Sequence, residues 1–234
     1  MRYSHPIEKI VERYVERTQG GRTDASTGIL GELGRLQSAV RALESVALNR
    51  NPAHTDAAHF KAVHDAGGRL QKAATATRQR ATEILNSQSE KLRQDLAART
   101  GLRPAADLLE ATTQAEIRAA VRSMGSQKRG ELLQRAVEAK DVTTLNALLH
   151  GPTFLTGLDD KLLAVQRERY ERAVAPEVLE KFDAVIEADE TLSTITKLAE
   201  RAASEAQDAR AAASFIAAET AAREASATFD AALQ

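Results

Sequence analysis

Apolar residues recur at alternating spacings of three and four along three long stretches of the chain. This spacing places them on one face of an α-helix, as in a heptad repeat, and no stretch has a clear strand pattern. It predicts helices over 24–48 and 55–99, and a last helix from Pro176 to the C-terminus. We therefore predict an all-α, elongated protein whose long heptad-like helices flank a small compact helical subdomain, without a β-sheet.

Five glycines mark special positions in these predicted helices. Gly28, Gly31 and Gly34 lie near the start of the helix over 24–48. A helical glycine costs about 1 kcal/mol relative to alanine, so these three indicate either a close crossing by another backbone or a frayed first turn. Gly67 and Gly68 are the weak point of the helix over 55–99, where it could kink or divide.

Residues 101–175 have the pattern of several short helices. Thr113 with Glu116 predicts a capping box at one helix start, and Thr156 with Asp159 predicts a second. The chain is thus predicted to divide into N-terminal helices over 1–50, a long helix over 51–100, a compact helical subdomain over 101–175, and an alanine-rich helix over 176–234.

The last predicted helix has alanine at most positions of its apolar seam. The chain contains 45 alanines, no tryptophan and no cysteine. Alanine lets two helices approach closely, but a long helix with few large apolar residues needs a partner for stability. The residues predicted to form a helix-association interface are Leu192, Ile195, Ala199, Ala202, Ala206, Ala209 and Ile216. After Ile216 the phase of the repeat shifts, and Ala218, Ala222, Ala225, Phe229 and Ala232 continue the seam.

Charge is distributed unevenly along the chain. Residues 1–140 carry 23 basic and 16 acidic residues, whereas residues 141–234 carry 9 basic and 17 acidic residues. Either these charges lie on solvated faces, or basic and acidic parts meet within one chain or between copies. Because residues 1–140 contain no dense basic cluster, their excess of positive charge is only weak support for nucleic-acid binding. No segment has the length of a membrane span or the apolar core of a signal peptide, so we expect a soluble protein that is not secreted through a signal peptide.

Histidines and aspartates gather in the stretch HTDAAHFKAVHDAGG. His54, His59 and His64 are five residues apart, which separates successive side chains by about 140° around a helix. The metalloprotease spacing of two histidines four residues apart is absent, and a metal site completed by a second chain is the minor alternative. We therefore predict no catalytic residues, no metal and no cofactor, in a protein that is not an enzyme.

The segment over residues 129–177 carries a helix, a short helix, a Gly-Pro turn and a charged helix, ahead of the long C-terminal helix. It resembles a segment of small helical structural and virion-associated proteins of tailed bacteriophages, although ankyrin-like and other helical hairpins have similar sequences. Phe154, Leu155 and Leu158 are expected to pack beneath the turn, and the resemblance implies no catalytic residues. The residues that carry it are Leu148, Leu149, Gly151, Pro152, Phe154, Leu155, Gly157 and Leu158.

These patterns favour a non-enzymatic helical protein that acts through homo-oligomerisation. The resemblance implies a virion or virion-assembly component of a tailed bacteriophage: an internal or ejection protein, a scaffold, or a portal or head–tail component. Its partners would be further copies and other virion proteins, in the virion or in the host cytoplasm. One alternative is a monomeric helical-bundle adaptor, in which the alanine seam packs against the helix over 55–99. Another is a helical protein that associates with DNA or membranes.

Overall fold

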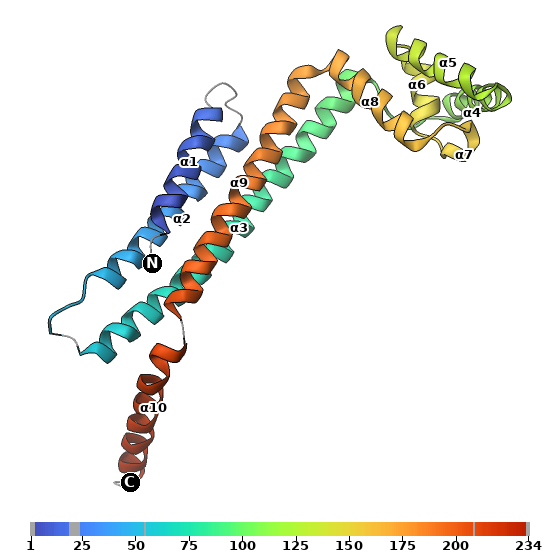
Figure 1. The fold of residues 1–234 in the computed structure, drawn as a ribbon. Coiled ribbons are helices and arrows are strands. Elements are labelled where there is room, and N and C mark those ends of the chain that lie inside the picture. The colour runs from blue at the N-terminus through green and yellow to red at the C-terminus, as the bar shows by residue number, and fades with distance from the viewer. Residues whose placement is uncertain (1–2, 19–23, 54, 208, 233–234) are drawn as a thin grey trace. The chain divides into compact units, whose positions relative to one another are not determined.

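The computed structural model of the protein describes residues 3–18, 24–53, 55–207 and 209–232, with side chains at all of these except 24–27 and 209–215. All regular structure in these residues is helical, so the predicted all-α fold without a sheet is confirmed (Figure 1). The helices are α1 (Ser4–Thr18), α2 (Asp24–Leu48), α3 (Asp56–Thr100), α4 (Leu108–Ser123), α5 (Ser126–Glu138), α6 (Val142–Leu149), α7 (Thr153–Thr156), α8 (Asp160–Val174), α9 (Pro176–Ala206) and α10 (Ala209–Ala232).

The chain divides into two compact units. The first, which we call the bundle unit, comprises residues 1–87 and 184–234, and the second, the short-helix unit, comprises residues 88–183. Helices α3 and α9 each contribute residues to both units. The units therefore end inside helices, whereas the four-part division predicted from the sequence follows helix ends and stays a prediction.

The bundle unit is built on apolar seams from α1, α2, α3 and α9. The heptad-spaced apolar positions of α2 from Ile29 to Leu43 are buried, and near the middle of α3 Ile84 is half-buried while its neighbour Leu85 is buried. An apolar stripe at this spacing faces a neighbouring helix and excludes water from it. The large side chains that are at most 2% exposed in this unit are Ile7, Tyr14, Ile29, Leu33, Leu36, Val40, Leu43, Leu70, Leu192 and Ile195.

Helices α1 and α2 pair side by side through contacts at both the core and the surface (Figure 1). Glu44 of α2 accepts hydrogen bonds from the backbone nitrogens of Ser4, at 2.9 Å, and Tyr3. A carboxylate at this place satisfies free N–H groups at the start of α1 and complements the helix dipole. Burial raises the pKa of Glu44, but the hydrogen bonds from Ser4 and Tyr3 outweigh it and hold the pKa below its ordinary value.

Helix α3 continues without interruption through Gly67 and Gly68, so the predicted weak point is not a break. A Cβ atom at Gly67 would lie 2.9 Å from the Cβ of Ala206 and 3.0 Å from the carbonyl oxygen of Ala203, both in α9. Gly67 therefore permits a close helix crossing of the kind that the sequence suggests for the glycines of α2. At Gly31 of α2, by contrast, an added Cβ would meet no atom within 4 Å.

Replacement of these two glycines by alanine should have opposite effects on stability. Gly67→Ala forces α3 away from α9, and we expect the free energy of unfolding to fall by about 1–3 kcal/mol. Gly31→Ala adds a methyl group in open space and removes backbone freedom from the unfolded chain, so we expect a gain of about 0.5–1 kcal/mol. Urea denaturation of both variants measures the difference, and equal effects of the two changes would contradict the close crossing.

Two buried tyrosines differ in how their hydroxyl groups are satisfied. The hydroxyl of Tyr14, in the bundle unit, has no hydrogen-bond partner among the described residues. Burial first, and the charge of Glu187 second, raise the pKa of Tyr14 to about 12. The hydroxyl of Tyr170, in the short-helix unit, donates to the carbonyl oxygen of Thr100 at 2.8 Å.

The two tyrosines should therefore respond differently to replacement by phenylalanine. At neutral pH, Tyr170→Phe should cost about 1 kcal/mol through loss of its hydrogen bond, whereas Tyr14→Phe should leave stability unchanged or slightly raised. The unfolded tyrosine ionises near pH 10, so the native protein should lose up to about 3 kcal/mol as pH rises from about 10 to 12. Tyr14→Phe should remove that part of the loss, and chemical denaturation across this pH range tests it. An identical pH profile in the variant would contradict the burial of this hydroxyl.

The short-helix unit corrects both predicted capping boxes. Helix α4 begins one and a half turns before Thr113, whose hydroxyl donates to the carbonyl of Leu109 at 3.0 Å inside the helix. Its cap is Asp107, which accepts from the backbone nitrogen of Glu110 at 2.8 Å. Helix α8 is capped by Asp159 itself, because Thr156 is the last residue of α7. An aspartate carboxylate is as good a cap as a threonine hydroxyl, and in both places it takes the role predicted for threonine.

The chain from Pro176 onward forms two helices rather than the single helix predicted. Helix α9 ends at Ala206, which is also the last residue of the buried seam, at 9% exposure. Helix α10 begins at Ala209, and from residue 216 onward none of its described side chains is buried. The burial found along the seam of α9 is thus absent from this part of α10.

Candidate functional site

The bundle core contains five of the seven residues predicted to form an association interface. Their side chains are covered within the single chain, and the last of them, Ala206, lies against Gly67 of α3. Association of copies through this seam stays a prediction. The exposed fractions are 2% for Leu192, 0% for Ile195, Ala199 and Ala202, 9% for Ala206 and 45% for Ile216, while the side chain of Ala209 lies outside the described residues.

Ion pairs join the basic and acidic parts of the chain. Within the bundle unit, Arg17 of α1 lies 2.8 Å from Glu187 of α9, and Lys61 of α3 lies 2.6 Å from Glu219 of α10. The hydrogen bond from Lys61 outweighs burial and lowers the pKa of Glu219. Because such partly exposed pairs contribute at most about 1 kcal/mol each, they guide the placement of helices more than they stabilise the unit.

Helix α10 presents its apolar seam to solvent. The ion pair with Lys61 anchors its first half to α3, but Phe229 of the seam is 64% exposed. Ile216, which precedes the shift in phase and lies on another face of the helix, is 45% exposed. The remaining seam residues, Ala218, Ala222, Ala225 and Ala232, are also exposed. Exposed apolar residues at heptad spacing are typical of a helix that packs against another helix.

The histidine-rich stretch lies on α3 and does not form a compact cluster. His54 is outside the described residues, and His59 is half-buried next to Phe60, with ring centroids 6.4 Å apart. His64 Nδ1 lies 3.6 Å from a carboxylate oxygen of Asp65. In the described ranges, no three His, Asp or Glu residues are placed to share a metal ion.

None of the helices formed by the described residues combines the length and the apolar character that a bilayer span requires.

The turn before α8 differs from the expectation drawn from the bacteriophage resemblance. Leu158 is buried at 8% exposure and Leu155 is half-buried, but Phe154 is 71% exposed on the short helix α7. Gly157 follows α7 in the left-handed region at φ = 67°, which turns the chain toward α8. The aromatic ring of Phe154 therefore projects outward from the turn.

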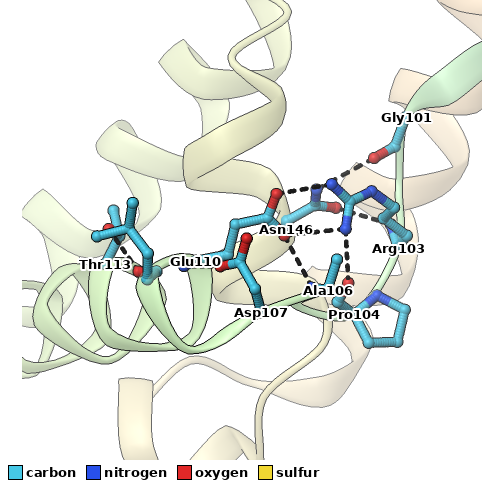
Figure 2. A network of polar contacts seen from close by, with 9 residues as sticks. Gly101, Arg103, Pro104, Ala106, Asp107, Glu110, Thr113 and Asn146 are labelled. Atoms are coloured by element: carbon cyan, nitrogen blue, oxygen red, sulfur yellow. Dashed lines mark hydrogen bonds and ion pairs between the residues drawn. The ribbon is translucent and has the colours of Figure 1, made fainter.

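A network of polar contacts, which we call the loop clamp, fixes the segment between α3 and α4 (Figure 2). Asn146 of α6 donates from Nδ2 to the carbonyl oxygen of Gly101 at 3.1 Å and accepts at Oδ1 from the backbone nitrogen of Arg103 at 3.0 Å. Gly101 has φ = 68°, a conformation in which a side chain would be strained. The carboxamide thus supplies partners for the carbonyl of Gly101 and the N–H of Arg103, while the N–H of Gly101 donates to the carbonyl of Ala97 at 2.9 Å.

Arg103 and Glu110 close the other side of the loop clamp. The two guanidinium nitrogens of Arg103 donate to the two carboxylate oxygens of Glu110 at 2.9 and 2.7 Å, and Ala106 donates its backbone N–H to the same carboxylate at 2.8 Å. The hydrogen bonds from Arg103 and then Ala106 lower the pKa of Glu110, while the bond to Glu110 raises the pKa of Arg103. Such a bidentate pair holds both side chains in fixed positions.

A pocket of about 460 Å³ opens beside the loop clamp. It lies between the first turns of α4 and the start of α6, and no sequence pattern predicts it. The signals that could have revealed the clamp are Asp107 three residues before Glu110 and a lone asparagine, Asn146, within the apolar run TLNALL. Lining residues are Gly101, Arg103, Leu109, Glu110, Thr113, Gln114, Val142, Thr143 and Asn146.

Removal of the clamp carboxamide should loosen the loop without changing the helices. Asn146→Ala leaves the Gly101 carbonyl and the Arg103 N–H without their partner, and we expect a loss of about 1–3 kcal/mol in the free energy of unfolding. Amide exchange of residues 101–106 should accelerate as well. Thr143→Ala, at an exposed neighbouring position of α6, is the control and should change stability by less than about 0.5 kcal/mol. A similar small effect for both variants would show that the clamp contributes nothing to the loop.

Comparison of the chain with protein-family models, curated proteins and solved structures finds no match. The described surfaces themselves must therefore support any statement about function.

Proposed function

We propose that this chain is a non-enzymatic helical assembly protein that joins copies of itself through α10. The observation that carries the proposal is the exposed seam of α10, in which Phe229 is 64% exposed and the flanking alanines are uncovered. An alanine-rich helix of this length is only marginally stable without a neighbour. A second helix packed on the seam would supply the stabilisation that the rest of the bundle unit does not provide.

A second copy of the chain is suited to cover the exposed seam of α10, because the seam is complementary to itself. In an antiparallel pair of α10 helices, the register that sets Phe229 beside Ala225 of the partner subunit also sets Ala222 beside Ala232 of the partner subunit. Each large ring then meets a small residue, and the contact is repeated by the two-fold axis. The seam sequence supports this arrangement, and the proposed assembly is a dimer or a larger oligomer built from such dimers.

The bacteriophage resemblance over residues 129–177 supports a more specific proposal. On that basis the protein is a virion or virion-assembly component of a tailed bacteriophage, present in the virion or the host cytoplasm, with other virion proteins as further partners. An assembly role is compatible with a chain whose bundle seam is covered and whose α10 seam is exposed.

A monomeric adaptor is the second candidate, and one observation favours it. The seam from Leu192 to Ala202 is buried within the chain, and ion pairs such as Arg17–Glu187 satisfy opposite charges there. These features remove one reason for self-association. In this alternative, α10 docks onto a different protein.

Native mass measured by light scattering over a range of concentrations tests the proposal. We expect the native chain to self-associate, and Ala222→Glu with Ala225→Glu to weaken association at least tenfold, since two charges would be buried in the seam. The matched control is Ala227→Glu with Ala231→Glu, on the opposite face of α10, which should leave the mass unchanged. Circular dichroism should show equal helix content in all three proteins.

A native chain that is monomeric at every concentration would contradict self-association and move the adaptor to first place. If the control pair weakens association equally, the added negative charge on α10, and not its position on the seam, governs association. Glutamates at Ala202 and Ala206 are unsuitable for this purpose, because Ala202 is fully buried and the change would unfold the bundle.

A further inference from the structure

A shallow groove between α1 and α2 lies on the surface of the bundle unit. Val11 and Val15 of α1 line it and are half-buried, and Gln37 lines it from α2. Its volume is about 430 Å³. Two valines four residues apart lie on the same face of a helix, so the groove offers a partly covered apolar surface on which a further apolar side chain can pack.

The part of the groove that α1 forms is acidic. Glu8, Glu12 and Glu16 line the groove at intervals of four residues, where like charges on a helix repel one another. Arg41 of α2 lies 2.5 Å from Glu8, which leaves that pair neutral. The side chains of Glu12 and Glu16 are exposed and make neither an ion pair nor a hydrogen bond with any residue that the structure describes. The groove therefore combines an apolar surface with two unpaired carboxylates.

The short-helix unit carries the complementary pattern on α8. Val165 is 61% exposed, and Lys161 and Arg169, four residues before and after it, are exposed as well. Lys161 has no ion-pair partner in the described part of the chain. Arg169 lies 3.7 Å from Glu138, and more than half of its side chain is exposed. This face of α8 therefore presents an apolar side chain between one unpaired and one loosely paired cation.

A further ion pair on this face of α8 leaves its net charge positive. Arg172 lies 2.9 Å from Glu168 on the same helix, so these two charges neutralise each other. The positive charge of Lys161 and Arg169 then faces the solvent, as does the negative charge of the groove. Opposite charge on two exposed surfaces draws them together and selects their orientation.

The two surfaces also have matching dimensions. Lys161 and Arg169 lie four residues, or about 6 Å, on either side of Val165. When Val165 packs midway between the two valines of α1, one cation comes level with Glu16 and the other lies within about 5 Å of the level of Glu12 along the helix axis. A lysine or arginine side chain is long enough to span such an offset. The contact would also remove three valine side chains from water.

We propose that α8 of one copy of the chain docks into the α1–α2 groove of another copy. Val165 packs between the two valines of α1, while Lys161 and Arg169 bind the unpaired carboxylates of the groove. The two surfaces differ, so the contact is heterologous, and its repetition closes a ring of copies or extends into a filament. It does not involve α10, and it therefore goes beyond the pairing of α10 proposed above.

Charge reversal on each surface tests the contact in the full-length protein. The reference chain carries the paired α10 seam substitutions proposed above, so that association through α10 is suppressed. Glu12→Lys with Glu16→Lys reverses the groove, and Lys161→Glu with Arg169→Glu reverses α8. Each pair sets like charges against each other, so we expect each to weaken association of the reference chain roughly tenfold or more. Light scattering up to millimolar protein measures the association.

Mixing the two reversed variants gives the sharpest readout. In an equimolar mixture, the acidic α8 of one variant meets the basic groove of the other, and the two surfaces left native also match. We expect the mixture to associate roughly tenfold more tightly than either variant alone. Docking of α8 into the groove of its own chain would not be restored by mixing.

Two further variants separate the charge pattern from general effects. Glu83→Lys with Glu90→Lys makes the same change in net charge as the groove variant, at exposed positions of α3, and should leave association unchanged. Val165→Asn removes the apolar side chain without a change in charge and should weaken association roughly threefold or more. Circular dichroism should show equal helix content in every variant.

Three results would overturn the proposal. These are a reference chain that is monomeric at every concentration, an equal effect of the control pair on α3, and a mixture that associates no more tightly than its components. Association of the native chain that disappears in the reference chain would leave the pairing of α10 standing alone, which separates the two tests.

Discussion

Gly67 has no side chain because Ala203 and Ala206 of α9 occupy the space in which one would lie. The approach of two backbones at this crossing requires small residues on both helices, since an added Cβ would lie 2.9 Å from that of Ala206. Alanine at the seam of α9 is thus a packing requirement of the bundle rather than a shortage of apolar side chains. The cost of a glycine inside a long helix is offset by the contact that it permits.

This constraint also determines which surface is left for partners. Ile195, Ala199 and Ala202 are buried against the chain's own helices, whereas the described seam positions of α10, beyond the last buried residue at Ala206, are uncovered. The short-helix unit follows a different principle. There a carboxamide and a bidentate ion pair fix the loop between α3 and α4.

The periodic pattern was sufficient to place α2, α3 and the start of α9, because an apolar face at helical spacing has to be buried. It did not predict the end of α9 at Ala206. The seam of α2 from Ile29 to Leu43 and the start of α9 at Pro176 follow from spacing and from proline chemistry. The pattern failed where several residues compete for one role: Asp107 caps α4 in place of Thr113, and Asp159 takes the place of Thr156. It could not identify the partner of the α9 seam, since alanine suits close packing within a chain and between chains equally. The pocket was missed because residues from 101 to 146 meet there only in the fold.

Amide hydrogen exchange of residues 192–206 as a function of protein concentration tests most directly whether the α9 seam is covered within one chain. If α3 of the same chain seals this seam, these amides should be strongly protected, and their exchange rates should not change on dilution. Protection that falls as the protein is diluted would show that a second copy covers the seam, and would contradict its closure by α3.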